Sequence, residues 1–413
     1  MKAKAWEIRC TVCGKRDTRF PPDYCEACGA PQEVHLDYEG VDARSLFDGQ
    51  IRDLWKYAPL YPVERPLQSL SLGEGGTPLI PASRAGQDLD TPDLWCKLDH
   101  LNPSGSFKDR CVVVGMAHAL ERGAEAVVCA SSGNAAGSVA TYAARAGVPA
   151  VILIPASTPA PKVAVAMAHG ALVFRVEGDF SRSFQLARQL GHVKGWVNLT
   201  TTFVNAVAIE GNKSVAYELF EQIGGVPDWI VVPVSSGPLL FGVWKGFLEL
   251  IRFGLADRMP RLVAAQPSGC APIARSFDEN RDDVTAWERV ETVVSGLNDP
   301  LVGYEGDGEL TLRAVRETNG VALAVPDSVI FEAGQVVAQR EGLFVEPAAA
   351  TSIAGVAELR RRGAITKGDK VVCLLTGHGL KQPWTGSRAE PPLVSGISDL
   401  LDSIGNLDLQ TSL

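Results

Sequence analysis

The sequence is poor in positive charge and contains no long hydrophobic run. Its 413 residues include 39 Lys and Arg against 48 Asp and Glu, so the formal net charge is −9. This balance argues against a protein that binds nucleic acid mainly by electrostatic attraction. No stretch approaches the roughly 20 apolar residues that a membrane-spanning helix needs, and the first residues, MKAKAWEIR, lack the apolar core of a secretory signal. We therefore expect a soluble, cytoplasmic protein with neither a nucleic-acid nor a membrane partner.

The composition also excludes wholesale disorder. Hydrophobic residues make up 46% of the chain and charged residues 21%, which is typical of a globular protein. The 41 Gly and 26 Pro are spread over many turns and form no repeat. A chain of this length predicts two or three domains.

Nine cysteines are present, and four of them form two CxxC pairs within residues 1–45, with the spacing C-x2-C-x11-C-x2-C. Two such turns can direct the thiolates of Cys10, Cys13, Cys25 and Cys28 toward one point, which is the tetrahedral ligand set of zinc. In a cytosolic protein this pattern favours metal over disulfides. We predict a zinc-ribbon-like unit over 1–45 with structural Zn²⁺, which stabilises the N-terminus without touching the chemistry. A ribbon that has lost its metal and a pair of redox couples are the alternatives.

From about residue 46 to residue 380, short apolar runs alternate with amphipathic runs. We expect strands over 126–130, 150–154, 172–176, 229–234 and 370–375, and helices over 134–145, 162–169, 183–190 and 239–253. Apolar strands between helices are typical of a parallel sheet that is covered on both faces, so the fold class is α/β. Residues 386–413 read as a tail. Ligands of such sheets bind beyond the carboxyl ends of the strands, so residues that follow the apolar runs are of most interest.

The segment 102–110, NPSGSFKDR, places a lysine at the start of an expected helix. The positive end of the helix dipole disfavours the charged form of Lys108. A neutral amine is what Schiff-base chemistry requires. A solvated loop lysine is the plainer alternative.

Three further segments of small residues follow apolar runs. SSGNAAGS at 131–138 suits an anionic or oxygen-bearing group at a helix N-terminus, or simply helix capping. SSGPLLFG at 235–242 suits a phosphate cradle, although Pro238 lacks an N–H, or an ordinary turn. In TGHGLK at 376–381, the Thr376 hydroxyl can approach a flat ligand, and we interpret His378 as a turn residue, with an acid–base role as the alternative.

Taken together, these segments resemble the threonine synthase family of pyridoxal-phosphate enzymes, within the tryptophan-synthase-β-like fold type. The resemblance covers residues 5–385 and includes the cysteine unit. It also includes LGEGGTPL at 72–79, IEG at 209–211, QPSGCAPI at 266–273 and EPAAA at 346–350. It implies two parallel-sheet α/β domains with the cofactor between them: a large domain of 46–110 and 196–385, and a small mobile domain of 111–195. It also implies a homodimer.

The resemblance implies a role for each matching residue. Lys108 would be the catalytic residue and form the internal aldimine with pyridoxal 5′-phosphate, and Asn134 would bond the cofactor's 3′-oxygen. Thr376 would meet the pyridine nitrogen. The other cofactor contacts would come from Phe107, Ser235, Ser236, Gly237, Pro238 and Leu239. Substrate would contact Ser106, Ser131, Ser132 and Lys213, with Ser131 and Ser132 at its carboxylate.

The implied reaction converts O-phospho-L-homoserine and water to L-threonine and phosphate, with Lys108 carrying protons. One departure bears on this small amino-acid substrate. The family has Arg before the Ile-Glu-Gly triplet, where it is associated with the substrate phosphate, and this chain has Ala208. The cradle, close to Gly-Asn-Gly-Gly-Asn in the family, is Ser-Ser-Gly-Pro-Leu.

A methyl group cannot replace a bidentate arginine. The nearby cations in the sequence are Lys213 and Lys245, and Lys213, at a helix start two residues past Gly211, is the one that could compensate. We therefore predict that O-phosphohomoserine is a poor substrate. The alternative is a paralogue that performs β- or γ-elimination or replacement on another amino acid, such as phosphoserine or a hydroxy or diamino acid. A non-catalytic scaffold belongs to a different class, and the presence of Lys108, Asn134 and Thr376 together argues against it.

Overall fold

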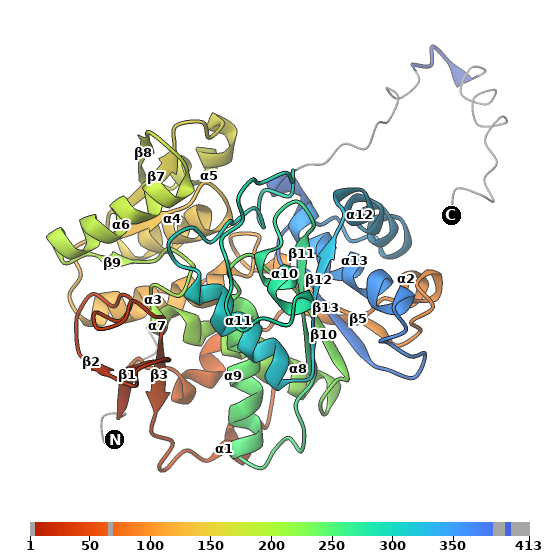
Figure 1. The fold of residues 1–413 in the computed structure, drawn as a ribbon, viewed down its shortest axis with the longest axis horizontal. Helices are drawn as coiled ribbons and strands as arrows, with labels where there is room; N and C mark the ends of the chain where they lie inside the picture. Colours follow the sequence, from red (N-terminus) through yellow and green to blue (C-terminus); the bar gives the residue numbers. More distant parts are fainter. Residues whose placement is uncertain (1–4, 65–68, 383–392, 398–413) are drawn as a thin grey trace.

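The computed structural model describes residues 5–64, 69–382 and 393–397, which form three sheets (Figure 1). The expected tail, 386–413, lies largely outside the described residues. The first sheet is antiparallel, in the order β2-β1-β3, and carries the cysteine turns. Its strands are β1 (Trp6–Cys10), β2 (Arg16–Asp17) and β3 (Gln32–Leu36). The short helix α1 (Ala43–Leu46) follows.

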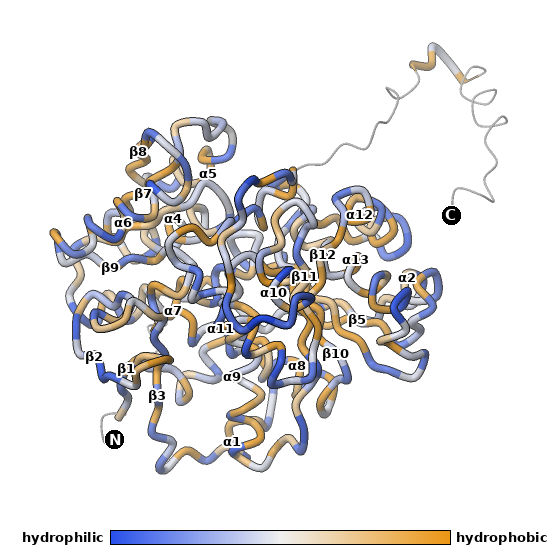
Figure 2. The backbone as a smooth tube through the Cα atoms, in the orientation of Figure 1, coloured by the Kyte–Doolittle hydropathy of each residue, from blue (hydrophilic) through white to orange (hydrophobic). Residues whose placement is uncertain are grey.

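The largest sheet has six strands in the order β12-β11-β10-β13-β5-β4. All neighbours are parallel except β4, which pairs antiparallel with β5 at the edge. The strands are β4 (Leu79–Pro81), β5 (Leu94–Lys97), β10 (Trp229–Pro233), β11 (Arg261–Pro267), β12 (Val321–Val325) and β13 (Val371–Leu374). The colouring is hydrophobic around β5 and β10, as expected for central strands (Figure 2).

Helices cover both faces of this sheet because alternate residues of each strand point to opposite sides. Ile230 and Val232 of β10 join one apolar core, and Trp229 and Val231 join the other. One face holds α2 (Ser83–Asp88), α12 (Asp327–Glu341) and α13 (Pro347–Arg361). The other holds α8 (Ser214–Ile223), α9 (Pro238–Arg252), α10 (Pro272–Asp278) and α11 (Gly306–Glu317).

The third sheet is wholly parallel, in the order β8-β7-β6-β9. Its strands are β6 (Val127–Ala130), β7 (Ala150–Pro155), β8 (Leu172–Val176) and β9 (Val197–Asn198). The helices α4 (Asn134–Ala146), α5 (Ala164–Ala168) and α6 (Phe180–Lys194) pack around it (Figure 1). Two more helices, α3 (Lys108–Glu121) and α7 (Ala206–Ile209), pack together below this sheet.

The predicted α/β class is confirmed, and each expected strand lies within two residues of an observed one. The edge strand β4 differs from the expected parallel pattern, which is common in mixed sheets. The expected helix over 162–169 begins as a 3-10 turn, and α6 is longer than expected. The division into domains, and the mobility of residues 111–195, stay predictions. Within the described ranges, no helix is both long and apolar enough to cross a bilayer.

Candidate active site

The lysine predicted to be catalytic is the first residue of α3, which follows β5 after a 3-10 turn, Asp99–Leu101, and a short loop. Two backbone hydrogen bonds join this loop to the turn that follows β13. The N–H of Phe107 donates to the carbonyl of Thr376 at 2.9 Å, and the N–H of His378 donates to that of Gly105 at 3.0 Å. Lys108 and Thr376, which are far apart in the sequence, are therefore held on adjoining turns.

A buried ionic network fixes the start of α3 to the rest of the protein. The guanidinium of Arg110 donates to Asp99 at 2.8 and 2.9 Å and to Glu218 at 2.6 and 2.8 Å. Lys97 donates to Glu218 at 2.6 Å, and all four side chains are buried. Such a network is costly to break because any lost partner leaves a buried charge unpaired. It sets the position of Lys108, two residues earlier on the chain.

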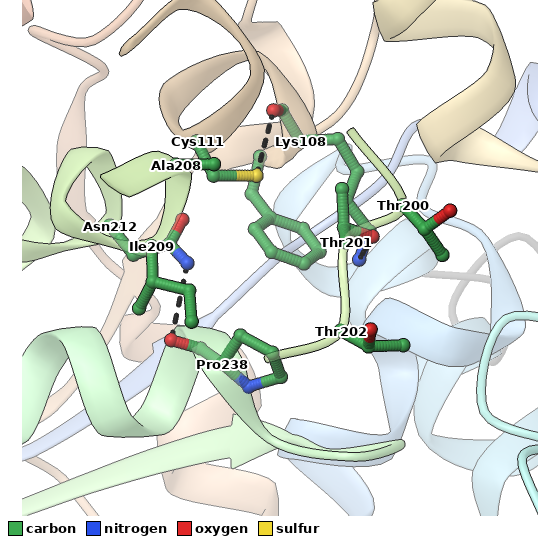
Figure 3. Close-up of a pocket in the computed structure, with 10 residues that line it drawn as sticks. Lys108, Cys111, Thr200, Thr201, Thr202, Ala208, Ile209, Asn212 and Pro238 are labelled. Atoms are coloured by element: carbon green, nitrogen blue, oxygen red, sulfur yellow. Dashed lines mark hydrogen bonds between the residues drawn. The ribbon is translucent and has the colours of Figure 1, made fainter. Parts of the chain in front are cut away.

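A small pocket adjoins Lys108 (Figure 3). It lies among α3, α7, the start of α9 and the loop after β9. Its lining consists of Phe107, Lys108, Cys111, Thr200, Thr201, Thr202, Ala208, Ile209, Asn212 and Pro238. The structure thus brings Ala208, which stands where the family's arginine was expected, into the wall beside Lys108.

Inside the pocket, the Nζ atom of Lys108 donates a hydrogen bond to Oγ1 of Thr201 at 2.6 Å. It also lies 4.5 Å from the centre of the Phe107 ring. Burial lowers the pKa of Lys108, and this effect is larger than the opposing effect of nearby acidic groups, which raise it. The cause is burial more than the helix dipole on which the sequence argument rested. The outcome is the same: the amine has an increased tendency to be neutral.

A second buried group is Glu346, to which the sequence analysis assigned no role. Its Oε1 atom accepts a hydrogen bond from Nδ2 of Asn134 at 2.7 Å, so it joins α13 to the start of α4. Burial raises the pKa of Glu346 to about 7, although Lys381 and the Asn134 bond oppose the rise. A carboxyl group with this pKa is about half protonated near neutrality, so it can both give and accept a proton there.

The turn at 235–239 ends at the N-terminus of α9. Gly237 has φ +103°, and a Cβ atom there would lie 2.0 Å from Oγ1 of Thr311. Only glycine fits this turn, because both the conformation and the space exclude a side chain. The first residue of α9 is Pro238, which lines the pocket, while Ser236 and Leu239 are buried behind it.

Other predicted site residues lie outside the pocket wall. Ser131 accepts the N–H of Gly133 through its hydroxyl at 3.2 Å and is a turn residue at the start of α4, followed by Ser132. Ser106 is fully buried, and its hydroxyl has no hydrogen-bond partner among the described residues. His378 accepts the N–H of Leu380 at 3.2 Å, as its interpretation as a turn residue requires.

The placement of Lys213 speaks against the substrate-binding role that we expected for it. Its ammonium group is fully buried, donates to Glu249 at 2.7 Å and to the carbonyl of Leu60 at 2.8 Å, and forms an ion pair with Glu210 at 2.7 Å. Two buried carboxylates and a carbonyl therefore surround this ammonium group. Lys245 is likewise paired with Glu210, at 2.7 Å. Neither lysine is available to a substrate phosphate.

The loop after β9 was missed from the sequence. Thr200, Thr201 and Thr202 all line the pocket, and a run of three hydroxyl side chains at the end of a short strand was a usable signal. No local signal pointed to Asn212, whose Nδ2 donates to the carbonyl of Pro238 at 3.1 Å. Its Oδ1 atom is buried without a partner in the described part of the chain.

The four predicted metal ligands converge as expected. The sulfur atoms of Cys10, Cys13, Cys25 and Cys28 all lie within 4.8 Å of one another. Sγ of Cys10 is 3.4 Å from that of Cys28, and Sγ of Cys13 is 3.7 Å from that of Cys25. A tetrahedral zinc with bonds of about 2.3 Å holds its sulfurs roughly 3.8 Å apart. The cluster is therefore compatible with a bound metal ion.

Comparison with known proteins extends these observations. A family described as "Pyridoxal-phosphate dependent enzyme" matches residues 70–377. The threonine synthase of Methanocaldococcus jannaschii is 36% identical over 392 residues, which cover 93% of this chain and 95% of that protein. That of Mycobacterium leprae is 36% identical over 81% of this chain and 90% of its own length. Maize serine racemase superposes with a TM-score of 0.64 at 23% identity, over 80% of this chain and 91% of that one, and shows the shared fold.

The residues present fit pyridoxal phosphate. A buried amine of lowered pKa, that of Lys108, stands beside a turn in which Gly237 leaves no room for a side chain. Buried polar atoms of Ser106 and Asn212 lack partners within the described residues and could serve a bound group. The N-terminus of α9 adds backbone N–H groups suited to a phosphate.

Proposed function

Because the chain belongs to the pyridoxal-phosphate-dependent enzymes and, within them, to the threonine synthase family, we propose that it eliminates or replaces a substituent on the side chain of a small amino acid. Lys108 is the proton carrier. The observation that carries this proposal is the buried amine of Lys108, held by Thr201 in a pocket at the carboxyl ends of the strands.

Pyridoxal phosphate, when bound, supplies the electron-accepting ring that stabilises a carbanion at the substrate's Cα. The chain supplies position and proton transfer. A neutral Lys108 amine has the lone pair needed to take the Cα proton. Its N–H bond to Thr201 fixes the direction of that lone pair. The turn at 235–239 would hold the cofactor phosphate, and Thr376, Asn134 and Phe107 would hold its ring.

The pocket best supports a substrate whose leaving group is not a phosphate monoester. Lys108 is the one cationic side chain among the residues that line it, and Ala208 offers only a methyl group. A phosphate monoester carries close to two negative charges near neutral pH. Burying it without a guanidinium partner is costly. Since Lys213 is fully paired, we see no compensating cation among the lining residues.

Conversion of O-phospho-L-homoserine to L-threonine is the second candidate. It is supported by the names of the relatives, which match this chain over most of its length. A homodimer, a cytoplasmic location and a structural zinc remain part of the proposal.

Two variants of one position test the substrate. We expect wild-type kcat/KM for phosphate release from O-phosphohomoserine to lie roughly 30- to 1000-fold below the ordinary value of about 10⁴ M⁻¹s⁻¹, since a charge-assisted contact is missing. Ala208→Arg should raise it, whereas Ala208→Met, which adds length without charge, should not. Efficient turnover by the wild type would instead establish the second candidate.

Cofactor absorbance identifies the true substrate. The holoenzyme is mixed with a panel of amino acids and phospho-amino acids, and the spectrum shows which of them react. A response to phospho-amino acids alone would contradict the preferred substrate class.

A further inference from the structure

The N-terminal cysteine unit reaches the loop that lines the pocket. The Oη atom of Tyr24, one residue before Cys25, donates to Oδ2 of Asp307 at 3.1 Å. The same oxygen accepts the backbone N–H of Phe203 at 3.0 Å. Tyr24 and Asp307 are both buried, and Asp307 lies in α11. One carboxyl oxygen of Asp307 therefore joins the cysteine unit to the end of the threonine run.

This contact is one anchor of the loop. At the other end, Oγ1 of Thr200 accepts the N–H of Ala130 at 2.8 Å. Between the anchors lies Thr201, which accepts the hydrogen bond from Lys108. A displacement of the backbone at Phe203 would therefore also move Thr201, the residue that accepts the hydrogen bond from Lys108.

Tyr24 is itself held tightly. The guanidinium of Arg188, in α6, lies 5.0 Å from the centre of its ring, and Phe184 meets the ring edge-on at 6.5 Å. Arg188 also donates to the neighbouring Asp23 at 2.9 and 3.1 Å. The hydroxyl of Tyr24 is thus presented to Asp307 in one orientation, between α6 and α11.

We propose that Tyr24 is a positioning residue for the active site, acting through Asp307 to hold residues 200–203 against Lys108. The cysteine unit then contributes to the chemistry as well as to the stability of the N-terminus, in contrast to the expectation from its sequence. The inference goes beyond the proposed function, because it holds whichever amino acid is the substrate.

Hydrogen exchange on the full-length holoenzyme tests this without a substrate. In Tyr24→Phe we expect the amide of Phe203 to exchange about 5- to 10-fold faster, as for the loss of one net hydrogen bond. Tyr38→Phe is the matched control. It removes another tyrosine hydroxyl of the N-terminal unit, which donates to Glu249 at 2.6 Å. Its exchange at Phe203 should match the wild type.

In Tyr24→Phe we also expect kcat to fall about 5- to 30-fold while KM stays within twofold of the wild type. The pH midpoint of the cofactor absorbance should shift in the same variant. Tyr38→Phe should show neither change. Asp307→Asn keeps an acceptor oxygen and should preserve slow exchange at Phe203, whereas Asp307→Leu should not, which tests the Asp307–Phe203 link. If Tyr24→Phe folds poorly, Asp307→Leu must still show the fall in kcat expected for Tyr24→Phe, and Asp307→Asn must not. Equal exchange at Phe203 in Tyr24→Phe and Tyr38→Phe, or in the two Asp307 variants, would overturn the proposal.

Discussion

The Nζ atom of Lys108 lies 2.6 Å from Oγ1 of Thr201, and this hydrogen bond joins the first turn of α3 to the loop after β9. The amine is buried, so it has few other partners and its direction depends on this hydroxyl. Catalysis by a positioned base depends steeply on such alignment.

Replacing the hydroxyl of Thr201 should therefore slow turnover. We expect Thr201→Val, which keeps the shape, to lower kcat by about 10- to 100-fold with KM within twofold. Thr201→Ser retains the acceptor and should stay within about threefold of the wild type. Steady-state kinetics with the substrate found by absorbance measure both. Equal losses in the two variants would show that packing, and not the hydrogen bond, is what matters.

Lys108 should be the residue that carries the cofactor. Borohydride reduction of the holoenzyme followed by peptide mapping should mark Lys108, since its amine is buried in the pocket and has a lowered pKa. Lys108→Ala should lose both the label and the visible absorbance. A label on another lysine, such as Lys381 near Glu346, would contradict the assignment.

The buried carboxyl of Glu346 predicts a pH-dependent stability. Its pKa rises from 4.5 to about 7 on folding, so the folded state keeps a proton that the unfolded state loses between these values. Burial of Glu346 therefore does not lower the free energy of unfolding below pH 4.5. The free energy of unfolding falls as the pH rises from 4.5 to about 7 and levels off above that pH. Glu346→Gln, which stays neutral and can still accept from Asn134, should gain about 2–3 kcal/mol relative to the wild type between pH 5 and pH 8.

Urea unfolding of the protein without cofactor at the two pH values measures this difference. Glu309→Gln, on the exposed side of α11, is the control, and its stability should equal that of the wild type at each pH because it retains Glu346. If the difference in unfolding free energy between Glu346→Gln and the wild type is the same at pH 5 and pH 8, the Glu346 carboxyl is ionised in the folded protein and the prediction is wrong.

The cysteine cluster should bind one zinc ion per chain. Metal analysis should find about one equivalent, because four thiolates complete a tetrahedral shell. Cys13→Ser should lower the zinc content and the melting temperature. Cys270→Ser, a buried cysteine outside the cluster, should leave the zinc content unchanged. Absence of zinc with four freely titrating thiols in the folded wild type would refute the site.

The amino-acid sequence by itself determined the features that depend on near neighbours. The strand over 172–176 and the helix that begins at Lys108 follow from hydrophobic periodicity and turn residues. The convergence of the four cysteines follows from two CxxC turns on one small sheet. Such signals are local, because each depends on residues within one or two turns of chain.

Only the tertiary structure decided which residues the polar side chains of the site contact. Lys108 meets Thr201 across 93 positions, Asn134 meets Glu346 across 212, and Tyr24 meets Asp307 across 283. It also decided that Lys213, which the sequence analysis assigned to substrate binding, is instead buried and ion-paired with Glu210 and Glu249. These pairings depend on the order in which the strands lie side by side and on which helix covers each face. Hydrophobic patterning buries a segment but does not specify its neighbour, so the contacts of each buried polar group emerge only when the layers are assembled.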